Sequence, residues 1–535
     1  MFLSGYCGII SELSLFNLGT LLMGGTNTTL LYTMGVMIFF MGVGSLMTET
    51  PLFRKIHFDQ FAWIEMLLSL GCMVSIPLIH ILAGLYPELT LTLFISVSAG
   101  IGLLIGTEIP VILRLNQGLG LQLTQNSARV MMADYFGSLV AFICFPFLLF
   151  PKVGIAFSAY SGGLINLVLA LLTVIFFREK LQSRNWVYFG LLTTVAFAIG
   201  LGLSLDSLTK MADKKLYRDP IIHQQNTAYQ TLVFTEGDST PAPPPHKATR
   251  GKLIYGSSTS RFSLRSLDDK SQGDLRFFIN GGLQFSTLDE YRYHETLVHP
   301  AMFLAPESTT ALVLGGGDGL AVRELLKYPQ LESIFVVDLD QELTDLFRFS
   351  ELARLNNFAF QNERVHILNE DAFMFLRNNP HRFPLLILDF PDPYHLQSAK
   401  LYSRQFFWLA SQALSKEGIL VVQSTSPLHN RKVFLCIKRT LESAGFSTLS
   451  LHVPMRSFEN WGFHLASQSL SEKQLRSRLR KFDLRVKTRF LDRDTIGGLL
   501  SFGKDIFHGF ESIPVNDLDH LVIVDLYKKK WHPNL

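Results

Sequence analysis

The residues best suited to chemistry are carboxylates that follow short apolar runs in the second half of the chain. They are Asp318 within a glycine-rich turn, Asp338, Asp389 and Asp392. Glycines let a backbone approach a ligand closely at the start of a helix. An acid about 20 residues after such a turn can accept both hydroxyls of a ribose. Carboxylates can also bind an amine and take its proton. The pattern indicates a site for an adenosine-type molecule and a cation or amine.

The turn Gly315-Gly-Gly-Asp-Gly319 lacks the spaced G-x-G-x-x-G of a pyrophosphate binder. Asp318 would repel a phosphate but suits the sulfonium of an S-adenosylmethionine-type ligand. The alternative for Asp389 and Asp392 is that they only cap the next segment as turn residues. An acidic pocket is favoured, because Asp318 and Asp338 are expected at the same edge of one sheet.

Only a parallel sheet would bring these acids together. Strand-like apolar runs occupy residues 311–314, 334–337, 365–368, 385–388 and 419–422. Helical patterns occupy residues 321–327, 372–378, 404–414 and 431–444. This alternation predicts an α/β Rossmann-like domain of the methyltransferase type over residues 309–470. The carboxyl ends of its strands would face a common crevice.

Shorter strand-like runs at residues 229–235, 275–280 and 283–286 predict a small β-domain before the α/β domain. A stretch rich in Gly, Ser, Thr, Pro and Lys at 236–272 indicates an inserted loop. We therefore expect a linker and small β-domain over residues 206–308. Residues 471–535 form a C-terminal extension whose role the sequence does not indicate.

The first 205 residues are depleted in charge. They contain 16 charged residues, against 77 in the remaining 330. Apolar stretches near the ~20 residues that a bilayer requires predict a multi-pass α-helical membrane domain over residues 1–205. About seven helices are expected, at residues 2–23, 29–48, 61–85, 89–113, 130–150, 153–177 and 186–205. A wholly soluble enzyme is thereby excluded.

Four acidic residues fall at or inside these expected spans: Glu12, Glu65, Glu108 and Asp134. Intramembrane carboxylates are candidates for a transport role. The alternative is that they pair with arginines or backbone groups near the interfaces. Lys and Arg counts in the loops conflict over orientation. An adenosine-type ligand would be supplied from the cytoplasm, which favours a multi-pass protein of the cell membrane whose second half lies on the cytoplasmic side.

Composition excludes several other classes of protein. The net charge of +3 gives no argument for a nucleic-acid partner. Four cysteines form no C-x-x-C pair, which argues against a zinc site or a disulfide framework. No metal site is expected.

Motifs across the chain resemble the spermidine synthases (polyamine aminopropyltransferases), and more closely their membrane-fused bacterial branch. The motifs are Gly315-Gly-Gly-Asp-Gly319, Asp289-Glu-Tyr-Arg-Tyr-His-Glu295, Asp389-Phe-Pro-Asp-Pro393, Tyr229-Gln230, Lys400-Leu-Tyr-Ser403, Gln423-Ser-Thr-Ser-Pro427, Trp461-Gly-Phe463 and Gly106-Thr-Glu-Ile-Pro110.

The resemblance implies transfer of an aminopropyl group from decarboxylated S-adenosylmethionine to putrescine or a similar polyamine, giving spermidine and methylthioadenosine. It requires no metal and no permanently bound cofactor. It also implies a homo-oligomer, either a dimer or a tetramer. By the same resemblance, Asp389 is the catalytic proton acceptor, and the amine is bound by Tyr293, His294, Asp318 and Asp392. The donor nucleoside is bound by Gln230, Gly315, Gly317, Asp338, Asp371 and Ala372.

Two other functions remain open at this point. A methyltransferase would use intact S-adenosylmethionine, although Asp318 would repel the methionine carboxylate. A membrane polyamine carrier or sensor would use the second half of the chain for binding without turnover. Tyr293 and His294 could also be ordinary interface residues between the β-domain and the α/β domain.

Overall fold

The computed structural model describes residues 1–23, 31–50, 53, 57–118, 123–217, 219–237, 273–457 and 459–528 of the 535-residue chain. The chain divides into two compact units, Met1–Ile221 and Ile222–Leu535. From residue 238 on, the loop insertion predicted at 236–272 lies outside the described residues.

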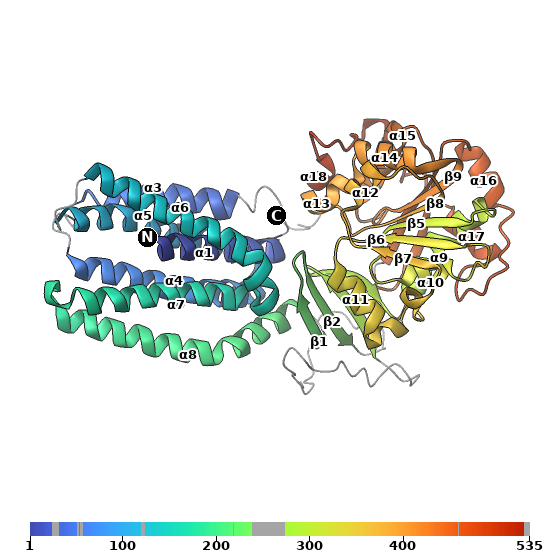
Figure 1. Cartoon of the computed structure of the whole chain (residues 1–535). Coiled ribbons are helices and arrows are strands. Elements are labelled where there is room, and N and C mark those ends of the chain that lie inside the picture. Colours follow the sequence, from blue (N-terminus) through green and yellow to red (C-terminus); the bar gives the residue numbers. More distant parts are fainter. Residues whose placement is uncertain are drawn as a thin grey trace. The chain divides into compact units, whose positions relative to one another are not determined.

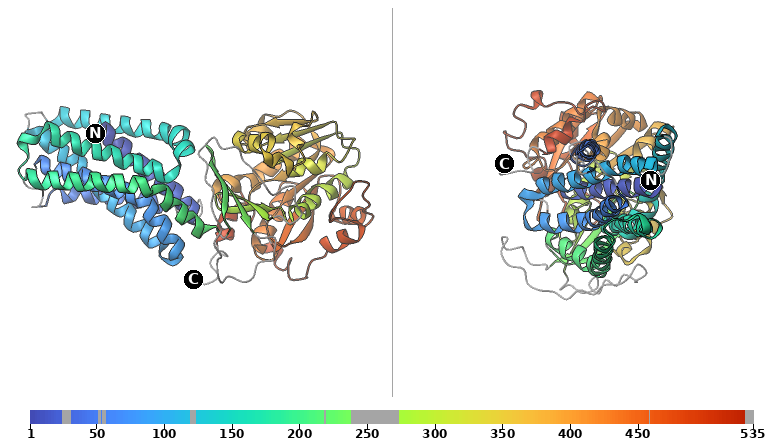
Figure 2. Two further views of the ribbon diagram at one scale, coloured as in Figure 1. Left: turned by 90° about the horizontal axis from the view of Figure 1, so that it is seen from below. Right: turned by 90° about the vertical axis from the view of Figure 1, so that its left-hand side faces the viewer.

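The first unit consists of helices that lie side by side (Figures 1 and 2). They are α1 (Phe2–Met23), η1 (Leu31–Gly35) continuing into α3 (Val36–Met47), α4 (Phe58–Leu85), η3 (Pro87–Leu89), α5 (Thr90–Gly118), α6 (Leu123–Cys144), η4 (Phe145–Leu149), α7 (Phe150–Phe176), η5 (Arg178–Lys180) and α8 (Arg184–Leu216). Within the described residues, four apolar helical segments are long enough to cross a membrane by length and composition: Phe58–Leu85, Thr90–Gly118, Thr124–Phe176 and Arg184–Ala212.

Glycines allow α3 and α5 to pack with their backbones in close contact. A Cβ added at Gly106 would lie 2.0 Å from the carbonyl oxygen of Met41, and one at Gly102 would lie 2.4 Å from that of Met37. Small residues permit this kind of close helix packing in apolar surroundings. Gly106 of the quoted Gly106–Pro110 motif therefore has a packing role.

Local hydrogen bonds satisfy some of the charged side chains in this unit. Glu65 and Glu108 are buried, and Glu108 accepts a hydrogen bond from Ser4. The Arg114 guanidinium donates to the carbonyl oxygen of Thr48 at 2.5 Å. Among the described residues, no arginine forms an ion pair with Glu65 or Glu108.

The second unit begins with a four-stranded sheet of order β1-β2-β3-β4: β1 (Ile221–Asn226), β2 (Thr231–Gly237), β3 (Asp274–Ile279) and β4 (Gly282–Ser286). The β2–β3 and β3–β4 pairs are antiparallel. Its core is aromatic, and the rings of Phe234 and Phe277 stack with centroids 4.6 Å apart. Tyr229 and Gln230 precede β2, so the expectation that they lie on the strand is wrong.

Helix α9 (Glu290–Leu304) leads into a seven-stranded sheet of order β10-β11-β9-β8-β5-β6-β7. Its strands are β5 (Thr310–Gly315), β6 (Ser333–Val337), β7 (Val365–Leu368), β8 (Phe383–Asp389), β9 (Leu414–Gln423), β10 (Ser447–Met455) and β11 (Glu459–Ser467). Strands β5 to β9 are parallel, whereas β11 pairs antiparallel with β9 and β10. This confirms the prediction of a Rossmann-like domain preceded by a small β-domain.

Helices and short helical turns cover both faces of this sheet (Figure 1). They are α10 (Leu320–Leu325), α11 (Gln341–Phe349), η6 (Glu351–Arg354), η7 (Ala359–Gln361), α12 (Ala372–Asn378), α13 (Leu396–Ala399), η8 (Lys400–Tyr402), α14 (Arg404–Ala413), α15 (Arg431–Ser443), α16 (Glu472–Leu479), α17 (Arg493–Leu499), η9 (Phe510–Ser512) and α18 (Val522–Lys528). The parallel strands are nearly continuous apolar runs, as expected for a sheet that is buried on both of its faces.

The C-terminal extension is part of the two cores that flank this sheet. Leu475, Leu479 and Ile496 are buried in one core, while Ile513 and Ile523 are buried in the other. The segment after residue 470 therefore packs against both faces of the α/β domain.

Candidate active site

The glycine-rich turn meets Asp389 at the point where the strand order reverses. Strands β5 and β8 are parallel neighbours, and Gly315 lies opposite Asp389. A Cβ on Gly315, whose φ is +81°, would lie 2.3 Å from the carbonyl oxygen of Asp389. The amide of Gly316 donates to that oxygen at 3.0 Å. Ligands of open α/β sheets bind at such a switch point.

Asp389 lies against this turn with one hydrogen bond from α9. The Tyr293 hydroxyl donates to Oδ1 of Asp389 at 2.6 Å. Desolvation by the surrounding protein raises the pKa of Asp389, and the charge of His294 and the hydrogen bond from Tyr293 oppose that rise. A carboxylate with a raised pKa is a better proton acceptor than an ordinary aspartate near neutral pH.

Asp318 lies in the turn itself, where Oδ1 accepts from the amide of Leu320 at 2.9 Å. Desolvation raises its pKa to about 6, with the charge of His294 opposing this rise and that of Asp389 adding to it. The four acids Asp318, Asp338, Asp389 and Asp392 all retain intermediate exposure. Each of the four residues therefore keeps some surface exposed, although desolvation is the largest influence on the pKa of every one of them.

The His294 ring is oriented by Glu290, which lies one turn earlier on the same helix. Its Nδ1 lies 2.9 Å from Oε2 of Glu290, and Arg323 binds both oxygens of Glu290 at 2.9 Å. Burial lowers the pKa of His294, but the hydrogen bond and charge of Glu290 outweigh it, so the net pKa is raised. The negative charges of Asp318 and Asp389 raise the pKa of His294 further.

Asp392 is the most fully hydrogen-bonded of the four acids. Its carboxylate accepts from the Tyr527 hydroxyl at 2.8 Å, from Thr425 Oγ1 at 3.0 Å and from Gln423 Nε2 at 3.3 Å. Desolvation raises its pKa to about 6, and these hydrogen bonds oppose the rise. These three donors hold the Asp392 carboxylate in one orientation.

Asp338 lies at the end of β6 on the other side of the turn. Its Oδ1 accepts from the amide of Asp340 at 2.9 Å. A Cβ added at Gly317 would lie 2.7 Å from Oδ2 of Asp338, so the turn leaves no room for a larger residue there. Desolvation raises the pKa of Asp338 to about 7, opposed by the backbone hydrogen bond from Asp340.

Gln230, which the resemblance assigned to the donor nucleoside, forms a hydrogen bond with Asp340. Its Nε2 donates to Oδ2 of Asp340 at 2.8 Å, and Thr227 donates to the same oxygen at 2.7 Å. Asp340 is the N-cap of α11. The contact joins the small sheet to the segment that follows Asp338.

Asp371 and Ala372 mark the start of α12 after strand β7. Asp371 is the N-cap, accepting from the amides of Phe373 and Met374 at 2.9 and 3.1 Å, and it pairs with Lys400 at 2.7 Å. Desolvation raises the pKa of Asp371, but the hydrogen bond and charge of Lys400 prevail and lower it. Ala372 is buried.

Several residues of the site escaped the sequence reasoning. Glu290 lies inside the Asp289–Glu295 motif and Gln423 and Thr425 inside the Gln423–Pro427 motif, so their motifs were visible while their roles were not. Tyr527 has no sequence signal, since it lies 135 residues from Asp392. In the described part of the chain, no group of three His, Cys, Asp or Glu residues is placed to hold a metal ion.

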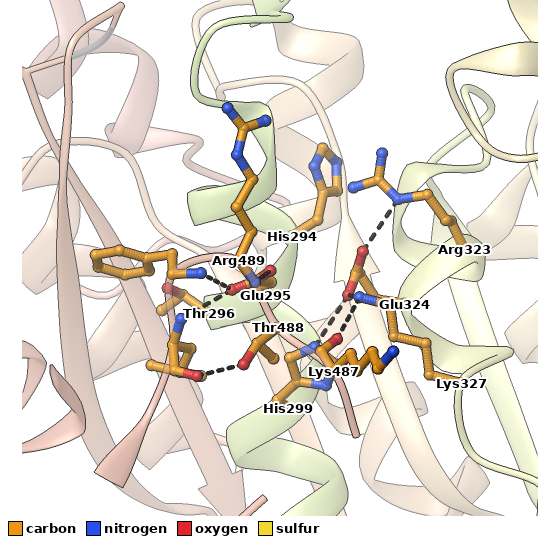
Figure 3. Close-up of polar contacts among 12 residues, drawn as sticks. His294, Glu295, Thr296, His299, Arg323, Glu324, Lys327, Lys487, Thr488 and Arg489 are labelled. Atoms are coloured by element: carbon orange, nitrogen blue, oxygen red, sulfur yellow. Dashed lines mark hydrogen bonds and ion pairs between the residues drawn. The ribbon is translucent and has the colours of Figure 1, made fainter. Parts of the chain in front are cut away.

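A polar network behind α9 holds that helix in place (Figure 3). Glu295 accepts from the amides of Arg489 and Phe490 at 2.6 and 2.9 Å. Nε2 of His299 lies 3.0 Å from Glu324. An open pocket of about 300 Å³ lies beside this network and is lined by charged residues that include Glu290, Glu295 and Glu324. Asp318, Asp338, Asp389 and Asp392 do not line that pocket.

Known proteins are similar in sequence to nearly the whole chain. Residues 290–476 match the family described as "Spermine/spermidine synthase domain". The polyamine aminopropyltransferase of Leptospira interrogans is 34% identical over 528 residues, which cover 98% of this chain and 96% of that protein. Polyamine aminopropyltransferase 1 of Streptomyces coelicolor is 36% identical over 482 residues, covering 89% and 84%.

A solved spermidine synthase in complex with the transition-state analogue AdoDATO is 19% identical, with a TM-score of 0.44, and the match covers 55% of this chain and 88% of that one. The relatives from Leptospira and Streptomyces exceed 30% identity across most of their own length. The chain therefore belongs to the spermine/spermidine synthase family of polyamine aminopropyltransferases.

Proposed function

We propose that this enzyme transfers the aminopropyl group of decarboxylated S-adenosylmethionine to putrescine, giving spermidine and methylthioadenosine. The observation that carries this proposal is the position of Asp389, a partly exposed carboxylate of raised pKa beside the glycine-rich turn and bonded to Tyr293. A base at this point is what an amine nucleophile requires, because alkyl ammonium groups have pKa values near ~10.

In the reaction, the neutral amine nitrogen attacks the carbon next to the sulfonium. The new C–N bond forms as the C–S bond breaks, and the sulfur leaves as a neutral thioether. The proton released by the attacking nitrogen passes to Asp389. Holding the nitrogen in line with the C–S bond is expected to supply much of the rate enhancement.

The other acids take the remaining parts of the two substrates. Asp318 and Asp392 bind ammonium groups of the acceptor, with Tyr293 and His294 fixing the reacting end. Asp338 accepts the ribose hydroxyls of the donor, while Gly315 and Gly317 allow its close approach.

The rest of the donor site comes from residues on neighbouring loops. Asp371 and Ala372 contact the base of the nucleoside at the start of α12. Gln230 acts indirectly, because it holds Asp340 next to the ribose site. The methyltransferase and the carrier without turnover are not favoured, since the family consists of aminopropyltransferases and Asp318 would repel a methionine carboxylate.

Product analysis tests this function directly. Full-length protein in detergent is given decarboxylated S-adenosylmethionine with putrescine, cadaverine, agmatine and spermidine in competition, and Asp389→Asn is the matched control. Mass spectrometry then follows methylthioadenosine and the aminopropylated amines. We expect spermidine from the unmodified chain. Methyl transfer, or no product from protein that binds the donor, would contradict the proposal.

We also propose where the enzyme lies in the cell and how it assembles. The four long apolar segments support a multi-pass protein of the cell membrane. The cytoplasmic supply of the donor supports a catalytic unit on that side. Protease digestion of intact cells should leave residues 273–528 uncut; their cleavage would reverse the orientation. Light scattering of the purified protein tests the expected homodimer or homotetramer.

A further inference from the structure

The C-terminal helix α18 contributes a side chain to the proposed amine site. The Tyr527 hydroxyl donates to Oδ2 of Asp392 at 2.8 Å. The same oxygen accepts from Thr425 at 3.0 Å. Residue 527 lies beyond residues 290–476, which match the family domain. The contact is therefore made by the C-terminal extension, outside the matched domain.

Helix α18 is anchored by the protein core. Ile523 is fully buried and Val524 nearly so. Just before the helix, buried Asn516 donates to the carbonyl oxygen of Ala399 at 3.0 Å and accepts from the amide of Ile523 at 3.3 Å. Because these bonds fix the start of the helix, Tyr527 at its end is presented in a defined position.

Tyr527 also shares an aromatic wall with the loop that carries Asp392. The ring of Tyr394 lies with its centroid 5.9 Å from that of Tyr527. A Cβ added at Gly282 would lie 3.0 Å from the Tyr394 hydroxyl, so the hairpin between β3 and β4 closes on the same loop. Aromatic faces beside a carboxylate suit an alkyl ammonium ion, through cation–π attraction and apolar contact with its methylene groups.

We infer that Tyr527 is a positioning residue for the acceptor amine. Its hydroxyl orients Asp392 toward the ammonium group at the far end of an aliphatic diamine, and its ring limits the length of diamine that fits. This inference rests on the proposed function, because it assumes that Asp392 binds the acceptor. The hydrogen bond also opposes the desolvation that raises the pKa of Asp392 to about 6.

The main test is Tyr527→Phe in the full-length chain, with donor saturating. A hydrogen bond to a charged group is worth about 1.5–3 kcal/mol, so we expect the KM for putrescine to rise about tenfold or more. The kcat and the donor Kd should remain unchanged. The acceptor KM should also start to rise at a higher pH than in the parent, because Asp392 loses a bond that favours its charged form.

Three comparisons separate positioning from a structural role. Val522→Ala trims a partly buried side chain of the same helix while keeping the Ile523 anchor and the Tyr527 hydroxyl, and it should keep the parent KM. Tyr527→Phe should add little in an Asp392→Asn background, because its effect acts through that carboxylate. Tyr527→Leu should shift the ratio of kcat/KM values toward cadaverine, the longer diamine. Melting temperatures check that each variant is folded.

Two results would overturn the inference. One is a putrescine KM within about twofold of the parent for Tyr527→Phe, which is below the value of one such bond. The other is an equal rise for Val522→Ala. Calorimetric binding of putrescine to donor-loaded Asp389→Asn protein, with and without Tyr527→Phe, repeats the test independently of turnover. Loss of turnover in the parent with every amine would instead contradict the proposed function.

Discussion

The Tyr293 hydroxyl lies 2.6 Å from Oδ1 of Asp389 and donates a hydrogen bond to it. Tyr293 lies on α9, and Asp389 is the last residue of β8. The bond leaves Oδ2 beside the glycine turn, since a Cβ on Gly316 would lie 3.3 Å from it. One carboxylate oxygen is thus held by the protein, and the other faces the turn where the donor is expected.

Asp389→Asn removes the proton acceptor while preserving the shape of the side chain. We expect kcat to fall by about 10²–10⁴-fold, the range typical of acid–base residues. The donor Kd should change little, because the ribose is assigned to Asp338. Stopped-time product assays and equilibrium dialysis of the donor measure the two quantities. Unchanged turnover would remove Asp389 from the catalytic role.

Gly317→Ala tests the donor side by steric means. The new methyl group would lie 2.7 Å from Oδ2 of Asp338 and 2.8 Å from Leu343, so the carboxylate must move. We expect the donor Kd to rise by about tenfold, close to the value of one hydrogen bond. Asp338→Ala should have a similar or larger effect. Gly497→Ala, where a Cβ meets nothing within 4 Å, is the control and should keep the parent Kd.

The pH profile of acceptor use should show an acid limb near pH 6. Asp318 and Asp392 each have a pKa raised to about 6. As the pH falls through that value, both acids gain protons and lose the charge that holds an ammonium. For ordinary aspartates the loss would come near pH ~4. We expect kcat/KM for putrescine to fall steeply below pH 6, and constant values down to pH 5 would contradict the assignment.

Glu290→Gln tests the charge state of His294. Burial lowers the pKa of His294, whereas the hydrogen bond and charge of Glu290 raise it. With glutamine, His294 should become neutral at a lower pH, and the pKa values of Asp318 and Asp389 should then rise. The acid limb of kcat/KM should therefore move to higher pH.

The readout for this variant is the shift of the pH profile together with the NMR titration of the His294 ring. A shift of about one pH unit corresponds to 1.36 kcal/mol. Glu417→Gln, an exposed acid on β9, is the matched control and should leave the profile in place. A lower kcat/KM at every pH with no shift would indicate a purely structural role for Glu290.

Local pattern and one rule of sheet geometry were enough to predict the main acids of the site. Gly315 and Asp389 each end a short apolar run, and the carboxyl ends of parallel strands meet at one edge. Asp338 followed from the same logic on the next strand. The length of the apolar stretches similarly predicted helices in residues 1–205, because long apolar segments leave few other arrangements.

The pairing of remote side chains could be decided only by the tertiary structure. Gln230 was predicted to bind the donor nucleoside, but no sequence pattern indicated its hydrogen bond to Asp340, which forms because the residues before β2 meet the N-cap of α11. Arg323 contacts Glu290 because α10 packs against α9, which neither segment reveals alone.

The contact between Tyr527 and Asp392 shows the same limit most clearly. A hydrogen bond forms between these side chains because α18 docks through Ile523 and Asn516, and docking depends on the packed surfaces of several elements. Sequence periodicity reports which face of one element is apolar. Periodicity does not indicate which distant element covers that face. The chain's own sequence thus determined the chemistry of its acids, and folding decided which neighbours orient them.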